Sequence, residues 1–212
     1  GVAQGQLGDH DHDHGGDHEH SGGRAPRHHS GSGPRHLTVR EETLRVVADA
    51  WQVFAAFLGS VTVMYLVFPF FTYVPTSGLL GDALPQVLFF ARIFADIIGR
   101  FAPRRKSLLV HSPGALLTMA AAKVVTAVLF FVYIKLPPRF HHDALSLGMV
   151  IFLWLVGGYI NTCANILAPA LTHPALVGRA SALLALIFQV AHFAGLLLAV
   201  LLAWVLYGDL VG

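Results

Sequence analysis

Five long apolar segments, separated by short breaks, constrain the fold of this chain most. They cover residues 47–74, 84–103, 107–135, 144–168 and 179–207, and each break contains Pro, Gly or charged residues. About 20 apolar residues are enough for a helix to cross the ~30 Å hydrocarbon core of a bilayer. Over the 212 residues, 55% are hydrophobic and only 12% are charged, a balance that is unusual for a soluble domain. The sequence therefore predicts an all-α integral membrane protein with five transmembrane helices.

The first 36 residues have a different composition. They are rich in Gly, Ser, His, Arg and Asp and have almost no large apolar side chains, so we expect a disordered segment. The run "GDHDHDHGGDHEHSGG" alternates His with acidic residues, and closely spaced imidazoles can hold zinc or copper weakly. The weak metal candidates are His10, His12, His14, His18 and His20. A soluble linker is the role that we expect first.

Residues 37–46 predict an amphipathic lead-in to the first span. Thr38 and Glu41 have the spacing of a capping box, in which each side chain bonds the other residue's backbone N–H. A helix should therefore begin directly after Thr38.

The basic residues predict the orientation in the membrane. Six fall on the same side as the tail, namely Arg40, Arg45, Arg104, Arg105, Lys106 and Arg179. The other side has Lys135 and Arg139. The positive-inside rule then places the N-terminal tail in the cytoplasm and, after five spans, the C-terminus in the extracellular or lumenal space. We expect the plasma membrane as the location.

The segment "VLFFARIFADIIGRF" carries most of the charge inside the spans. Phe89, Ile93, Asp96 and Arg100 fall along one helical stripe, and Arg92 lies beside it. Asp96 and Arg100 are four residues apart, so they can neutralise each other within the helix. The pair could serve insertion alone, or it could face a water-filled cavity and bind a neutral, hydroxyl-rich ligand.

Lys123 and His192 leave alternatives open. Lys123 could extend its amine to the headgroups or pack against the 84–103 segment. His192 could be a hydrogen-bonded structural residue, or it could contact substrate or take a proton.

Small and amide side chains predict helix contacts. Asn161 and Asn165 are expected to form hydrogen bonds between helices, and Ala191 and Gly195 are expected to form a close-packing face.

The stretch "FFARIFADIIGR" resembles the most characteristic span of the equilibrative nucleoside transporters. Phe89, Asp96, Gly99 and Arg100 fit that pattern, whereas Ile93 stands where the family usually has Asn. "FPFFTYVP", "GGYINTCANILAPAL" and "RASALLALIFQVAHFAGLLLA" are similar to other spans of that family, and the likeness covers residues 45 to 207.

The resemblance implies half of a major-facilitator-like helix bundle, the last five of eleven spans. The chain begins with Gly1 and is expected to be a fragment, whose partner is the missing six-helix half of the same protein. The resemblance further implies that nucleosides, or else nucleobases, move by alternating access. It implies sugar contacts for Asp96 and Arg100, and cavity-lining positions for Phe68, Phe89 and His192.

Other classes of function are less well supported. A divalent-metal transporter with a His-rich cytoplasmic loop is the main alternative, but away from their ends the spans offer only Asp96 and His192, beside several cations. A non-transporting membrane scaffold is the third class. No catalytic triad, paired carboxylates or cofactor motif is evident, so we expect neither an enzyme nor a cofactor. The few basic residues of the tail are mixed with acidic ones, which does not favour nucleic-acid binding.

Overall fold

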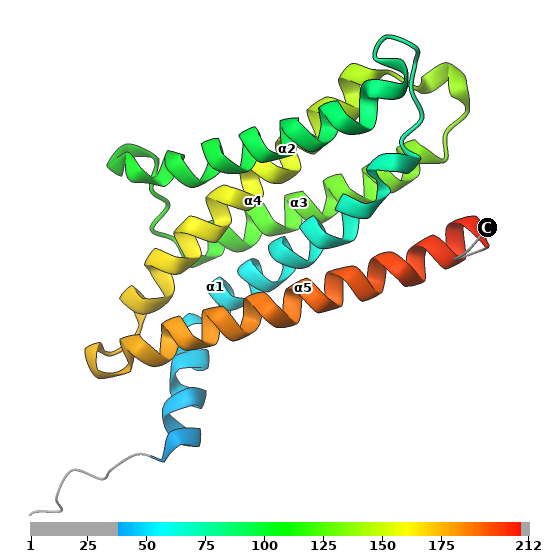
Figure 1. Ribbon diagram of the computed structural model, residues 1–212. Helices are drawn as coiled ribbons and strands as arrows, with labels where there is room; N and C mark the ends of the chain where they lie inside the picture. Colours follow the sequence, from blue (N-terminus) through cyan, green and yellow to red (C-terminus); the bar gives the residue numbers. More distant parts are fainter. Residues whose placement is uncertain (1–37, 209–212) are drawn as a thin grey trace, which may run out of the picture. The chain divides into compact units, whose positions relative to one another are not determined.

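The structure, a computed structural model, describes residues 38–208. The chain divides into two units, Gly1–His36 and Leu37–Gly212, and every described helix belongs to the second. The predicted disorder and the five tail histidines lie outside the described residues. Within 38–208 the structure is all-helical, without a strand. Figure 1 shows its long helices, which are α1 Val39–Val67, α2 Leu84–Phe101, α3 Pro113–Ile134, α4 Asp143–Leu171 and α5 Val177–Tyr207.

The first helix begins where the capping box predicts. The Thr38 hydroxyl accepts a hydrogen bond from the Glu41 backbone N–H at 3.3 Å, and the Thr38 backbone N–H donates to the Glu41 carboxylate at 2.8 Å. The helix bends at Ala50, whose φ of −126° and ψ of 21° are not helical. The segment before the bend stands at an angle to the rest (Figure 1). A 3₁₀ turn, Phe68–Tyr73, continues α1 because Pro69 cannot donate to the α-helical ladder.

The helices differ from the predicted segments mainly at the third segment. Residues 107–112 lie outside α3, which begins at Pro113, a residue suited to a first helical turn because its missing N–H needs no partner there. Lys106–Leu108 instead forms a short 3₁₀ turn within the connection.

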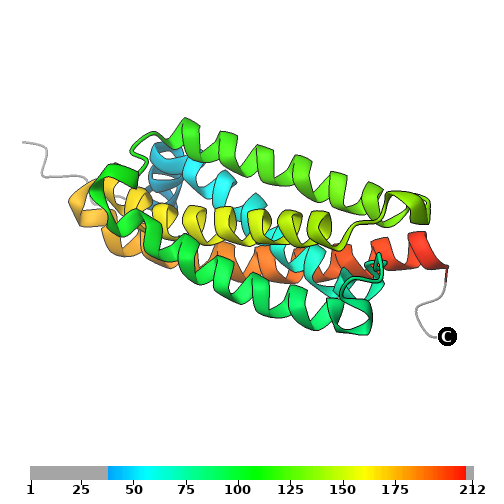
Figure 2. The ribbon, with the colours of Figure 1, turned by 90° about the horizontal axis from the view of Figure 1, so that it is seen from above.

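Helix α1 occupies the middle of the bundle. It packs against α3, α4 and α5, while α2 packs mainly on α4. Figures 1 and 2 show α5 running along α1, and α2 running along α4. The buried apolar side chains form two clusters, and both take residues from α1, α3, α4 and α5.

Two close helix contacts depend on glycine. A Cβ at Gly99 of α2 would overlap the Leu155 carbonyl oxygen of α4, and a Cβ at Gly158 of α4 would overlap the Asp96 carbonyl oxygen of α2. A Cβ at Gly195 of α5 would lie 2.6 Å from the Thr62 carbonyl oxygen of α1. Because Gly195 and Ala191 are also buried, the predicted close-packing face of α5 is confirmed.

A buried carboxylate holds the connection between α1 and α2. Asp143, only 1% exposed at the start of α4, accepts hydrogen bonds from the backbone N–H groups of Ser77 at 2.6 Å and Leu80 at 2.8 Å. The Thr76 hydroxyl donates to it as well, at 3.1 Å. These bonds fix the connection that leads into α2.

Four helical segments are long and apolar enough to cross a membrane: Val39–Tyr73, Pro113–Ile134, Asp143–Leu171 and Pro174–Tyr207. Helix α2 has only 18 residues and carries Arg92, Asp96 and Arg100, so it stands apart from these four. Its outer side is nevertheless apolar, since Phe94 and Ile98 are about 60% exposed. The prediction of an all-helical membrane protein is thus supported, while a fifth span at α2 stays a prediction.

Candidate functional site: a charged cavity among α1, α2 and α4

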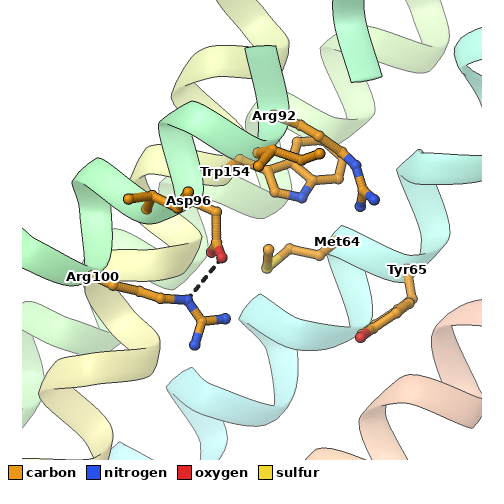
Figure 3. A pocket seen from close by; sticks show the side chains of 8 residues that line it. Met64, Tyr65, Arg92, Asp96, Arg100 and Trp154 are labelled. Carbon is orange, nitrogen blue, oxygen red and sulfur yellow. Dashed lines mark hydrogen bonds and ion pairs between the residues drawn. The ribbon is translucent and has the colours of Figure 1, made fainter. Parts of the chain in front are cut away.

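A cavity of about 200 Å³ opens between α1, α2 and α4. Figure 3 shows it from close by, with charged side chains from α2 on one wall and α1 on the other. The lining residues are Met64 and Tyr65 of α1; Arg92, Ile93, Asp96, Ile97 and Arg100 of α2; and Trp154 of α4. Three of the eight side chains, those of Arg92, Asp96 and Arg100, carry a charge.

Asp96 and Arg100 form an ion pair on the cavity wall. The Arg100 Nε atom lies 2.7 Å from the Asp96 Oδ2 atom, one helical turn away. The Asp96 side chain is 21% exposed and the Arg100 side chain is 49% exposed. The sequence left open whether Asp96 and Arg100 only neutralise each other or face a cavity. In the structure they form an ion pair and also line the cavity.

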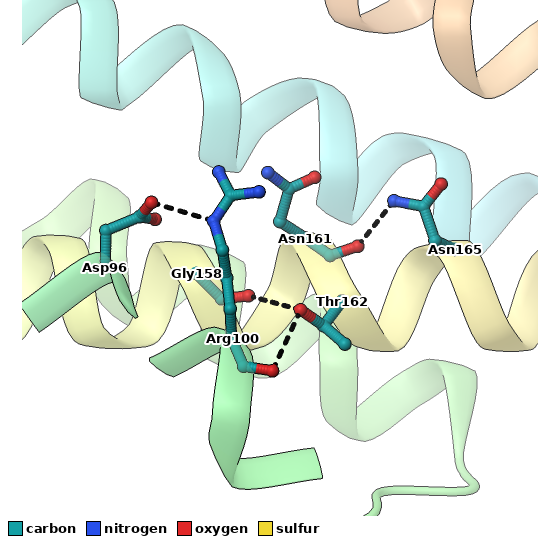
Figure 4. Close-up of polar contacts among 6 residues, drawn as sticks. All are labelled: Asp96, Arg100, Gly158, Asn161, Thr162 and Asn165. Atoms are coloured by element: carbon teal, nitrogen blue, oxygen red, sulfur yellow. Dashed lines mark hydrogen bonds and ion pairs between the residues drawn. The ribbon is translucent and has the colours of Figure 1, made fainter. Parts of the chain in front are cut away.

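The other Asp96 oxygen accepts no hydrogen bond from Arg100. Asp96 Oδ1 is buried and has no hydrogen-bond partner among the described residues. It would lie 2.9 Å from a Cβ at Gly158, so only glycine lets the carboxylate come this close to α4. The Thr162 hydroxyl joins the two helices next to this contact, with the Gly158 and Arg100 carbonyl oxygens 3.2 and 3.4 Å away (Figure 4).

Arg92 is the cavity residue whose role sequence reasoning missed. Its guanidinium carbon lies 4.1 Å from the ring centre of Phe68, 4.8 Å from that of Phe89 and 5.9 Å from that of Trp154. Attraction between the cation and the aromatic faces holds the side chain here. The four-residue spacing of Arg92 from Asp96 was the only indication in the sequence that Arg92 belongs to the site. That spacing does not indicate that the guanidinium contacts aromatic rings.

The remaining predicted site residues are divided between the cavity and its surroundings. Ile93 lines the cavity, as do Asp96 and Arg100. Phe68 and Phe89 are not among the lining residues and instead contact Arg92. His192 of α5 also lies outside the lining, half-buried, where it stacks on the Tyr65 ring with centroids 3.8 Å apart.

Lys123 lies behind the cavity wall and does not reach the headgroups. It is 0% exposed, and its Nζ atom donates to the Ser60 carbonyl oxygen at 2.7 Å and to the Ser60 hydroxyl at 2.9 Å. A Cβ at Gly157 would lie 2.6 Å from this Nζ and 2.8 Å from Met64 Sδ. The snorkelling alternative is therefore wrong, because the Lys123 amine lies inside the bundle, bonded to Ser60 of α1 and next to Gly157 of α4.

The two asparagines of α4 also differ from expectation. The Asn165 side-chain amide donates to the Asn161 carbonyl oxygen of the same helix at 2.8 Å (Figure 4). The predicted hydrogen bond between helices is wrong, because the four-residue spacing lets an amide bond the preceding turn.

The possible metal ligands among residues 38–208 do not cluster. No group of three or more His, Cys, Asp or Glu side chains comes together within that range. The five tail histidines lie outside it.

Comparison with known proteins adds no relative: no protein-family model, no curated protein and no solved structure matches this chain. The resemblance to the equilibrative nucleoside transporters rests on the quoted residues alone. What the described residues establish is an all-helical chain with four helices apolar and long enough to span a membrane, and a charged cavity beside α2.

Proposed function

We propose that this chain is the C-terminal part of a membrane transporter that moves nucleosides, with nucleobases as a second substrate class, by alternating access. The observation that carries the proposal is the Asp96–Arg100 ion pair, 2.7 Å apart on the wall of a cavity in an apolar helix bundle. A charge inside a membrane costs at least about 2.5–3.5 kcal/mol on insertion scales, so retained charges usually have a function. We assign α2 as a fifth span with these charges turned inward.

The chemistry of the pair suits an uncharged, hydroxyl-rich ligand. A carboxylate accepts hydrogen bonds and a guanidinium donates several, whereas each ribose hydroxyl can do both. Because the two charges cancel, the pair exerts little net pull on an ion. We therefore assign Asp96 and Arg100 to the sugar, Ile93 to the adjoining wall, and Phe68, Phe89 and His192 to the aromatic surroundings that orient the site.

The size of the cavity fits a site that is completed from another side. Cavities that enclose small ligands measure about 300–1,000 Å³, and the present one is about 200 Å³. In a major-facilitator-like transporter, a second helix bundle would close the site, and rocking of the two bundles would open it alternately to each side. The proposed orientation keeps the tail in the cytoplasm and the transporter in the plasma membrane.

Uptake by the full-length protein tests the proposal. Transport-deficient cells that express it should take up radiolabelled uridine and adenosine faster than cells with empty vector. Asp96→Asn and Arg100→Ala should each lower uptake at least about tenfold, since a hydrogen bond to a charged group contributes about 1.5–3 kcal/mol. The matched control is Asp82→Asn, because Asp82 is exposed in the turn before α2. Uptake no faster than with empty vector, at normal surface abundance, would refute nucleoside transport.

Zinc transport remains the alternative, and no observation within residues 38–208 favours it. Asp96 is the acidic residue of the cavity lining, and Arg92 and Arg100 on the same wall would repel a divalent cation. Zinc uptake by the same cells, abolished by Asp96→Asn, would favour the metal over the nucleoside.

A further inference from the structure

The polar side chains of the cavity are mostly hydrogen-bond donors. Arg92, Arg100 and Trp154 can only donate, while Asp96 can only accept and the Tyr65 hydroxyl can do either. The Met64 thioether is a weak acceptor. A ligand that fills this cavity must therefore supply more acceptors than donors.

The Asp96–Arg100 pair lines one end of the cavity. Asp96 Oδ2 already accepts from Arg100 Nε, and Asp96 Oδ1 is buried against Gly158. Little acceptor capacity is left there once a sugar hydroxyl has bound. The base of a nucleoside held by its sugar at this pair would extend along α2 toward Arg92, one turn away.

Arg92 presents donors in a fixed orientation. The Arg92 guanidinium carbon lies 4.1 and 4.8 Å from the centres of the Phe68 and Phe89 rings, which cover the guanidinium. Its N–H groups are left to donate hydrogen bonds to a ligand. No described residue forms a salt bridge with Arg92, and its buried Nε has no hydrogen-bond partner within residues 38–208. In Figure 3 the guanidinium lies between α2 and α1, above the Tyr65 ring.

Trp154 adds a donor near the same end. The side chain is almost fully buried, yet its indole N–H makes no hydrogen bond to another described residue, and the ring lies at the cavity beside Arg92 (Figure 3). A ligand that placed an amino group here would set donor against donor and leave the N–H groups of the cavity unpaired.

We infer that this cavity selects oxo-purine nucleosides over amino-purine nucleosides, and that Arg92 is the residue that sets the preference. The inference rests on the proposed function. The oxo purines fit best, because their carbonyl oxygen and a neighbouring ring nitrogen form two adjacent acceptors that one guanidinium can bind in bidentate fashion. An amino purine replaces that oxygen by a donor, and the second hydrogen bond is lost.

Matched nucleoside pairs test the inference. Inosine and adenosine differ in whether one ring position carries a carbonyl or an amino group, and so do uridine and cytidine. Inhibition constants for all four are measured against uptake of a labelled nucleoside by the full-length protein. Inosine should inhibit at least about tenfold better than adenosine. Uridine and cytidine are the reference pair and should differ less, because cytidine keeps two adjacent acceptors, O2 and N3, beside its amino group.

Variants at Arg92 then identify the residue responsible. Arg92→Met removes the donors and should bring the inosine-to-adenosine ratio close to one. Arg92→Gln supplies an acceptor as well as a donor and should shift the ratio toward adenosine. The matched control is Arg104→Met, since Arg104 also lies 4.1 Å from an aromatic ring, that of Phe101, but outside the cavity. It should leave the ratio unchanged.

The outcomes separate the inference from the function on which it rests. Equal inhibition by inosine and adenosine would overturn the inference and leave nucleoside transport standing. An unchanged preference in both Arg92 variants, at normal surface abundance, would overturn the role of Arg92. Absence of uptake and of inhibition by all four nucleosides would refute the proposed function and the inference with it.

Discussion

Gly99 permits the close contact between α2 and α4 that places the ion pair beside the cavity. Alanine at this position would put a methyl group onto the Leu155 carbonyl oxygen and 3.0 Å from the Tyr159 backbone nitrogen. Both atoms belong to the backbone of α4 and cannot rotate away. We therefore predict that Gly99→Ala forces the two helices apart.

Two opposing effects determine how much Gly99→Ala changes the free energy of unfolding. Overpacking of a close contact costs about 1–3 kcal/mol, and a clash with backbone favours the upper part of that range. Replacing glycine by alanine inside a helix stabilises it by about 1 kcal/mol. Gly148→Ala in α4 gains the same helix propensity without a clash, because nothing lies within 4 Å of the added methyl. The difference between the two variants isolates the clash, at about 1–3 kcal/mol.

The assay is the thermal unfolding midpoint of the purified full-length protein in detergent, combined with nucleoside uptake. Gly148→Ala should raise the midpoint slightly, whereas Gly99→Ala should lower it. Gly99→Ala should also reduce uptake, because Gly99 lies between Asp96 and Arg100 and its displacement carries both away from the cavity. Equal midpoints for the two variants, with uptake unchanged, would refute the close packing of α2 on α4.

Two further predictions concern buried polar residues. Lys123→Ala should lower the unfolding midpoint, because it removes a fully buried stem and leaves a void, a change that costs about 2–5 kcal/mol for side chains of similar length, whereas Lys106→Ala in the exposed turn should not. A midpoint equal to that of Lys106→Ala would indicate that Lys123 reaches the surface. Asp143→Asn should lower the unfolding midpoint, because the amide nitrogen that replaces one carboxylate oxygen cannot accept the hydrogen bond from Ser77 or from Leu80, whichever faces it. Hydrogen exchange at one of these two backbone amides should then accelerate relative to Asp82→Asn, and unchanged exchange at both would contradict the bonds.

The sequence predicted the helices well, because long apolar segments ended by Pro, Gly and charge have few alternatives. The start of α1 followed from Thr38 and Glu41 alone, since capping is a local interaction. The first residues of the third segment were misjudged, because hydropathy does not distinguish an apolar connection from a helix. The bend at Ala50 has no marker in sequence, because alanine is a good helix former.

The site was predictable where neighbours along one helix determine it. Asp96 and Arg100 are one turn apart, so their ion pair could be expected from spacing. Lys123 could not be placed, because its partner Ser60 is 63 residues away on another helix. The contact of Arg92 with Phe68 and the stacking of His192 on Tyr65 depend on how α1, α2 and α5 pack together, and one sequence carries no signal for that.

The central claim is that a nucleoside binds in the cavity beside α2, and protection of a cysteine at Ile97 tests it most directly. Ile97 lines the cavity and is 44% exposed, while the native Cys163 is fully buried and should not react. Ser107→Cys, in the exposed turn before α3, is the matched control. Saturating inosine or uridine should slow thiol modification of Ile97→Cys and leave that of Ser107→Cys unchanged. Modification of Ile97→Cys at the same rate with and without nucleoside would contradict the account.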